Sequence, residues 1–96
     1  MENAAPLNDL RHEIDALDRA LIELLAQREK LVERVLLVKK AENLPGRIQS
    51  RVDTVVNNAC ARAAEIGMNP DLARTVWSAM VEWFVQHEEI RLAQKR

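Results

Sequence analysis

The chain has 96 residues, of which 48% are hydrophobic and 30% charged, and its formal net charge at pH 7 is -1. This composition is typical of one small folded domain covering 1–96 and excludes an intrinsically disordered chain. The charge gives no overall positive field for nucleic acid or a membrane surface, and no stretch approaches the ~20 apolar residues of a membrane span. Residues 1–6 lack the pattern of a signal peptide. The single cysteine, Cys60, cannot form an internal disulfide, so we expect a reducing, cytoplasmic location.

Apolar residues in the first third of the chain recur in alternating steps of four and three. This spacing predicts a long amphipathic helix from about 8 to 42. One position of the stripe holds Arg28 instead of a leucine. An arginine on a buried face keeps its proton, so it requires an anion from the protein or from a ligand. The stripe consists of Leu10, Ile14, Leu17, Leu21, Leu24, Leu31, Val35 and Val38.

The length of this helix points to a second copy of the chain. At 1.5 Å per residue the helix is ~50 Å long, whereas a compact globule of this mass is only about 25–30 Å across. Two shorter helices of the same chain are too small to cover the whole apolar stripe. The sequence therefore predicts an intertwined helical homodimer, with a long coiled-coil dimer carrying peripheral helices as the alternative.

Two clusters of glycine and proline divide the rest of the chain into two more helices. The first cluster, Asn43-Leu44-Pro45-Gly46, is a turn signal. In the second, Gly67 fits a helix C′ position, Asn69 an N-cap and Pro70 a first helical residue. We expect helices from about 48 to 66 and 70 to 93, no strand, and frayed ends at 1–6 and 94–96, which makes the fold all-α. The expected apolar stripes are Ile48, Val52, Val55, Ala59, Ala63 and Ile66, then Leu72, Val76, Trp77, Met80, Val81 and Phe84, with Trp83 also expected in the core.

Arg28 and Lys39 share one face of the first helix. Eleven residues at 100° each bring them within ~20° around the axis and ~16 Å along it, so together they could clamp a small dianion. Arg11 lies ~42 Å from Lys39 along the same helix and could reach that pocket only from a partner chain. The simpler interpretations are an Arg11–Asp15 pair and a solvated Lys39 beside Lys40.

Glu88 extends the apolar stripe of the third helix by one step of four residues. A carboxyl on that face could pair with Arg28, or it could lie at a solvated rim next to Glu89. His12 and His87 have no partners at ligand spacing, so we expect no metal site.

The chain resembles the all-α chorismate mutases over nearly its whole length. The third helix, with Glu82-Trp83-Phe84-Val85, is most similar to the isochorismate pyruvate-lyase branch of the same fold. Arg51 and the break from Gly67 to Asp71 also match. The first-helix residues that carry the resemblance are Leu10-Arg11, Ile14-Asp15, Asp18, Leu21, Leu24-Leu25, Arg28 and Lys39.

The resemblance implies a Claisen rearrangement of chorismate, a small dicarboxylate, to prephenate in aromatic amino-acid biosynthesis. This reaction needs no nucleophile, general base, cofactor or metal, only conformational restriction and charge stabilisation. By resemblance, Arg28 and the partner chain's Arg11 bind the substrate carboxylates, and Arg51 supports them. Lys39 and Glu88 would donate to the ether oxygen.

The chain departs from typical bacterial mutases at three positions. Glu88 replaces a glutamine and can donate only when protonated, so turnover is expected to improve as the pH falls below about 7. Ile48 and Val52 replace acidic residues that meet the ring hydroxyl. The departures leave an isochorismate pyruvate-lyase, a mutase for an amino analogue of chorismate, or a non-catalytic helical dimer as alternatives. Further candidates for contact with the substrate are Gln49, Ser50, Val52 and Phe84.

Overall fold

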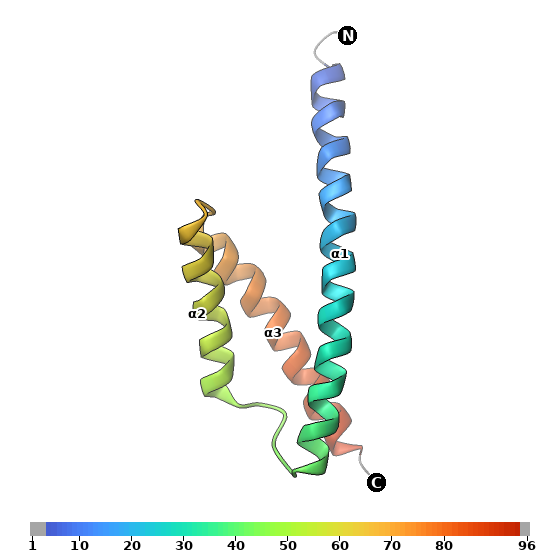
Figure 1. Ribbon diagram of the computed structural model, residues 1–96, viewed down its shortest axis with the longest axis vertical. Coiled ribbons are helices and arrows are strands. Elements are labelled where there is room, and N and C mark those ends of the chain that lie inside the picture. The colour runs from blue at the N-terminus through green and yellow to red at the C-terminus, as the bar shows by residue number, and fades with distance from the viewer. Residues whose placement is uncertain (1–3, 95–96) are drawn as a thin grey trace. The chain divides into compact units, whose positions relative to one another are not determined.

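The computed structural model describes residues 4–94, which form three helices: α1 (Ala4–Ala41), α2 (Gln49–Glu65) and α3 (Pro70–Ala93) (Figure 1). No strand occurs within this range, so the all-α, three-helix prediction is confirmed. Helix α1 already begins at Ala4, and residues 1–3 and 95–96 lie outside the described part, so fraying at 1–6 and 94–96 stays a prediction. No described helix combines the length and the apolar character that crossing a membrane requires.

The chain divides into two compact units, 1–34 and 35–96. The described part of the first unit is a continuous stretch of α1 that carries most of the apolar stripe expected from the sequence. In a single chain these side chains are between 55% and 64% exposed, so the stripe is not buried. Arg28, at the gap in the stripe, is half-buried. The exposed stripe residues of this unit are Leu10, Ile14, Leu17, Leu21, Leu24 and Leu31.

The second unit contains the end of α1 and the antiparallel pair α2 and α3, which pack against each other (Figure 1). Removing side chains such as Val56, Val81 and Phe84 from water stabilises this unit, by roughly 1.5–3 kcal/mol for each fully buried large side chain. The buried apolar residues of the unit are Leu36, Val56, Ala63, Ala73, Val81, Phe84 and Val85.

The packed faces of α2 and α3 agree only in part with the expected stripes, of which Ala63, Val81 and Phe84 are buried. Ile66, Leu72 and Val76 are 60%, 54% and 45% exposed, and Trp83, expected in the core, is 58% exposed. The packed face of α3 instead includes Ala73, one helical position beyond Leu72. Successive residues are 100° apart around a helix, so Ala73 and Leu72 point in different directions. Helical periodicity alone does not say which side of the apolar stripe packs against the other helix of the same chain.

The connection between α2 and α3 follows the predicted capping chemistry. Gly67 has a φ of +82°, and its N–H donates to the Ala64 carbonyl at 3.3 Å while the Met68 N–H donates to the Ala63 carbonyl at 2.8 Å. These two bonds form a Schellman motif, which favours glycine at the left-handed position. The Asn69 side chain then accepts the Asp71 N–H at 2.8 Å, and Pro70 begins α3.

The end of α1 has the same type of cap, with Asn43 at the left-handed position (φ 59°). The Leu44 N–H donates to the Lys39 carbonyl at 2.8 Å, and the Asn43 N–H donates to the Lys40 carbonyl at 3.4 Å. The predicted turn at 43–46 is therefore confirmed. Lys39 and Lys40 occupy the last turn of α1, where positive charge is favoured by the helix dipole.

Candidate active site

The ammonium group of Lys39 makes two hydrogen bonds within the second unit. Lys39 Nζ donates to the Gly46 carbonyl at 2.8 Å and to Oε1 of Glu88 at 2.8 Å. The side chains of Lys39 and Glu88 are only 12% and 8% exposed. The interpretation of Lys39 as a solvated lysine at the helix end is therefore wrong.

Glu88 lies on the apolar face of α3, as the sequence predicts, and belongs to the buried residues of that helix. Its carboxylate forms an ion pair with the Lys39 ammonium. Because a buried carboxylate without a cation is costly, the ion pair explains why this side chain can be buried on α3. Placement at a solvated rim is excluded by its burial, whereas Glu89 beside it is exposed.

The contacts of Lys39 leave it able to bind one more acceptor. An ammonium has three N–H donors, and Gly46 and Glu88 use two of them. A donor that is already oriented in a poorly hydrated place stabilises developing negative charge more strongly than one in water. Lys39 is therefore suited to hold an oxygen on which charge grows during a reaction.

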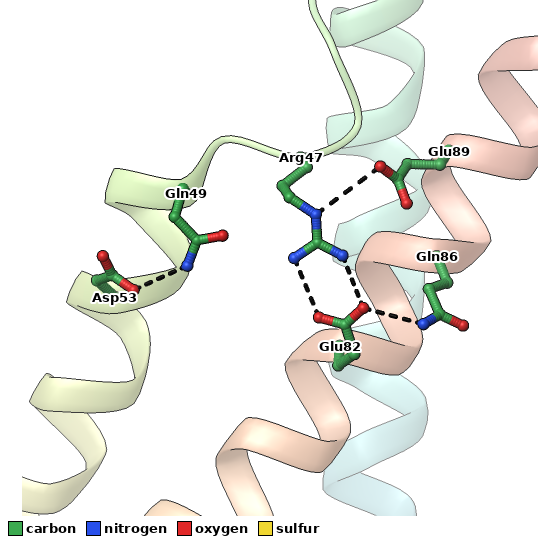
Figure 2. Close-up of polar contacts among 6 residues, drawn as sticks. All are labelled: Arg47, Gln49, Asp53, Glu82, Gln86 and Glu89. Carbon is green, nitrogen blue, oxygen red and sulfur yellow. Dashed lines mark hydrogen bonds and ion pairs between the residues drawn. The ribbon is translucent and has the colours of Figure 1, made fainter.

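A second group of charges, which the sequence analysis did not single out, ties the loop after α1 to α3 (Figure 2). Arg47 donates from Nη1 to Oε1 of Glu82 at 3.0 Å and from Nη2 to Oε2 at 2.6 Å, and its Nε lies 3.8 Å from Oε2 of Glu89. Gln86 donates to the same Glu82 carboxylate at 2.9 Å. The sequence does contain a signal for this group. Glu82, Gln86 and Glu89 are spaced by four and three residues, so they share one polar face of α3 that could bind a cation.

Both partners of this bidentate pair have shifted pKa values. The hydrogen bonds from Arg47 lower the pKa of Glu82 below 4.5, and the hydrogen bond from Gln86 adds to the effect. The hydrogen bond to Glu82 is also the main reason that the pKa of Arg47 is raised. Each group therefore favours the charged form of the other under ordinary conditions.

A cleft of about 360 Å³ lies between α2 and α3 and contains two of the further candidates, Gln49 and Val52. The Gln49 amide is occupied within its own helix, because it donates to Oδ1 of Asp53 at 2.9 Å. Across the cleft, Arg74 donates to the Asn57 side chain at 3.3 Å. The cleft thus has a polar wall formed by side chains that bind one another.

The remaining candidates lie on all three helices. Arg11 is exposed and Arg28 half-buried on α1, and Arg51 is exposed near the start of α2. Ser50 is also exposed, and its backbone carbonyl accepts a hydrogen bond from the Thr54 hydroxyl at 2.9 Å.

Phe84 is buried on α3, and the centre of its ring lies 5.2 Å from the centre of the Trp83 ring in an edge-to-face arrangement. The Arg11–Asp15 ion pair offered as the simpler interpretation is not among the ion pairs of residues 4–94.

The described side chains contain no group of three or more histidine, cysteine, aspartate or glutamate residues that could hold a metal ion. The chemistry that this part of the chain offers consists of hydrogen-bond donors and fixed charges, above all the Lys39 ammonium.

Comparisons with known proteins agree with these features. The chorismate mutase type II family matches residues 10–89. The chain is 38% identical to the T-protein of Enterobacter agglomerans over 72 residues and 40% identical to that of Haemophilus influenzae over 70 residues. These matches cover 75% and 73% of the chain but only 19% of each T-protein, so the chain spans about a fifth of their length. It is also 30% identical over 76 residues to a 4-amino-4-deoxychorismate mutase of Streptomyces pristinaespiralis, covering 79% of the chain and 59% of that protein. The chain belongs to the chorismate mutase type II family.

Proposed function

We propose that this protein is a chorismate mutase that converts chorismate to prephenate in aromatic amino-acid biosynthesis. The observation that carries the proposal is the buried Lys39 ammonium, held by Glu88 and the Gly46 carbonyl in a chain of this family. The proposed location is the cytoplasm, where the cysteine Cys60 would stay reduced.

The reaction is an intramolecular rearrangement in which the ether C–O bond breaks while a new C–C bond forms. No atom or electron leaves the substrate, so no nucleophile, base or cofactor is required. Negative charge grows on the ether oxygen as the C–O bond lengthens, and an N–H of Lys39 donates to that oxygen. This contact strengthens in the transition state and therefore lowers the barrier.

The carboxylates of the substrate would bind Arg28, Arg51 and the partner chain's Arg11. Arginine suits this role because its planar guanidinium binds a carboxylate through two parallel hydrogen bonds. Binding in the chair-like reactive conformation supplies the rest of the acceleration by restricting the substrate. We propose that Gln49, Ser50, Val52 and Phe84 also contact the substrate, as expected from the sequence.

The proposal includes a homodimer with shared active sites. Its support is the apolar stripe of α1, since Leu10, Leu17 and Leu24 are 57%, 64% and 60% exposed in a single chain. A continuous apolar face of this kind is unfavourable in water, and a second copy of the same helix would cover it. From the helical spacing expected of the sequence, Arg11 would reach the pocket only across such an interface.

A second candidate activity is the rearrangement of an amino analogue of chorismate. The similarity to a 4-amino-4-deoxychorismate mutase favours it, and so do the apolar residues at two positions that the resemblance assigns to the ring substituent. Ile48 occupies the N-cap position of α2 and Val52 lines the cleft, and both are half-buried. Neither side chain can accept a hydrogen bond from the ring hydroxyl of chorismate.

A direct assay separates these activities. The purified protein is mixed in turn with chorismate, 4-amino-4-deoxychorismate and isochorismate, at pH 5.5 and pH 7.5, and the products are identified. Prephenate from chorismate supports the proposal, whereas rearrangement of the amino analogue alone supports the second candidate. Salicylate and pyruvate from isochorismate would identify a lyase instead. Absence of any product would leave a non-catalytic helical dimer.

A further inference from the structure

The loop between α1 and α2 approaches the backbone of α3 very closely at Gly46. A side chain at this position would place its Cβ 2.9 Å from the Glu89 backbone nitrogen and 3.0 Å from the Glu89 Cγ. Gly46 is also buried. The loop therefore lies directly on α3, in a position that depends on the absence of a side chain.

Arg47 anchors the loop immediately after this close approach. Its two terminal nitrogens bind both oxygens of Glu82, at 3.0 Å and 2.6 Å, and its Nε lies 3.8 Å from Glu89 (Figure 2). Gln86 orients the Glu82 carboxylate by a further hydrogen bond at 2.9 Å. A bidentate pair fixes direction as well as distance, so it defines where the Arg47 backbone can lie.

The same peptide unit carries the acceptor for Lys39. The Gly46 carbonyl that receives a hydrogen bond from Lys39 Nζ at 2.8 Å belongs to the planar peptide that joins Gly46 to Arg47. Any movement of the Arg47 backbone therefore rotates or shifts that carbonyl. Of the two acceptors that hold the ammonium, Glu88 is fixed by α3 and the Gly46 carbonyl is fixed by this anchor.

We propose that Arg47 is a positioning residue for Lys39: by binding Glu82 it holds the Gly46 carbonyl in place and so aims the ammonium. The role of the aimed ammonium in catalysis rests on the proposed function, whereas the coupling between Arg47 and Lys39 does not. The proposal assigns Arg47 no contact of its own with the substrate, because its guanidinium is held by Glu82 and Glu89.

The coupling is tested first without activity. In protein labelled with ¹⁵N-lysine, the ammonium of Lys39 should give a proton signal in cold NMR spectra, because burial and hydrogen bonding slow its exchange with water. The Lys39→Arg variant assigns the signal. We expect Arg47→Ala and Glu82→Gln to broaden or shift it, and Arg47→Lys to restore part of it. Arg62→Ala is the matched control, since the exposed Arg62–Glu65 pair lies within α2, and it should leave the signal unchanged.

The kinetic test uses the same variants at a temperature at which circular dichroism shows all of them folded. Misplacing a catalytic group by about 1 Å can lower a rate roughly 100-fold. We therefore expect kcat of Arg47→Ala to fall roughly 10- to 100-fold with KM changed by less than about threefold. Arg62→Ala should keep the wild-type kcat.

An unchanged Lys39 signal in both Arg47→Ala and Glu82→Gln would overturn the proposal, whatever their activity. A shifted signal with wild-type kcat would support the coupling between Arg47 and Lys39 but overturn its importance for catalysis. If the wild-type protein rearranges none of the substrates, the proposed function fails, and the NMR comparison alone still decides whether Arg47 positions Lys39.

Discussion

Lys39 and Glu88 lie 49 positions apart in the sequence and form an ion pair with Nζ 2.8 Å from Oε1. Both side chains are at most 12% exposed, so neither charge can recover its hydration if the other is removed. The pair joins the last turn of α1 to the C-terminal half of α3. Substitutions at Glu88 can separate its contribution to the free energy of unfolding from its contribution to kcat.

Removal of the carboxylate should destabilise the fold. Glu88→Ala leaves the Lys39 ammonium buried without a counter-charge, and breaking a buried pair in this way costs about 3–5 kcal/mol. The free energy of unfolding in urea should fall by a comparable amount. Glu65→Ala, which breaks the exposed pair with Arg62 in α2, should change it by less than about 1 kcal/mol. Equal losses in the two variants would contradict a stabilising role for the buried pair.

Glu88→Gln should retain or raise kcat. The amide oxygen can still accept from Lys39, and the amide N–H₂ can donate to the ether oxygen, which a carboxylate cannot do. Steady-state kinetics of Glu88→Gln, Glu88→Ala and the wild type would measure the change. Loss of activity in Glu88→Gln as severe as in Glu88→Ala would show that the negative charge itself is required.

Acid should weaken the Arg47–Glu82 anchor. Hydrogen bonds from Arg47 and then Gln86 lower the pKa of Glu82 below 4.5, so the folded state binds a proton at this site less readily than the unfolded chain. The stabilisation is complete above about pH 4.5 and is lost as the pH falls through the lowered pKa. Unfolding in urea between pH 3 and 7 should show a smaller loss in acid for Glu82→Gln than for the wild type. Parallel curves for the two proteins would rule this contribution out.

Gly46→Ala should destabilise the protein by steric overlap. The added Cβ would lie 2.9 Å from the Glu89 backbone nitrogen, which cannot move without disturbing α3. We expect a loss of about 1–3 kcal/mol, as for other overpacked positions, together with reduced kcat because the Gly46 carbonyl is displaced. Gly67→Ala provides the comparison, since its Cβ meets nothing within 4 Å and only its φ of +82° is strained. It should cost about 1 kcal/mol and leave kcat unchanged.

Shared active sites predict complementation between two inactive variants. If Arg11 acts across a dimer, a heterodimer of Arg11→Ala and Arg28→Ala has one site with both arginines intact and one with neither. Equal amounts of the two proteins, unfolded and refolded together, should form half heterodimers and recover about a quarter of wild-type activity. Recovery of no activity from a mixture that sedimentation shows to be dimeric would mean that both arginines serve the pocket from the same chain.

The sequence predicted the elements well because the relevant signals are local. Gly67, Asn69 and Pro70 define the α2–α3 connection through backbone geometry that any chain with these residues favours. The position of Glu88 on a buried face also followed from helical periodicity. Its pairing with Lys39 could not be predicted, because a contact between residues far apart in sequence depends on how helices pack. Arg47 was missed for the same reason, since its partners Glu82 and Glu89 lie on another helix.

The cap at the end of α1 has a thermodynamic consequence for ligand binding. Lys39 accepts the Leu44 N–H through its backbone carbonyl and donates to Gly46 through its ammonium, so one short loop fixes both ends of the residue. A free lysine side chain gives up roughly 1.5–2 kcal/mol of rotamer entropy when it is ordered. In this protein that loss occurs during folding. An anion that binds Lys39 therefore meets a side chain that is already ordered, and its affinity is not reduced by the entropy of four flexible torsions.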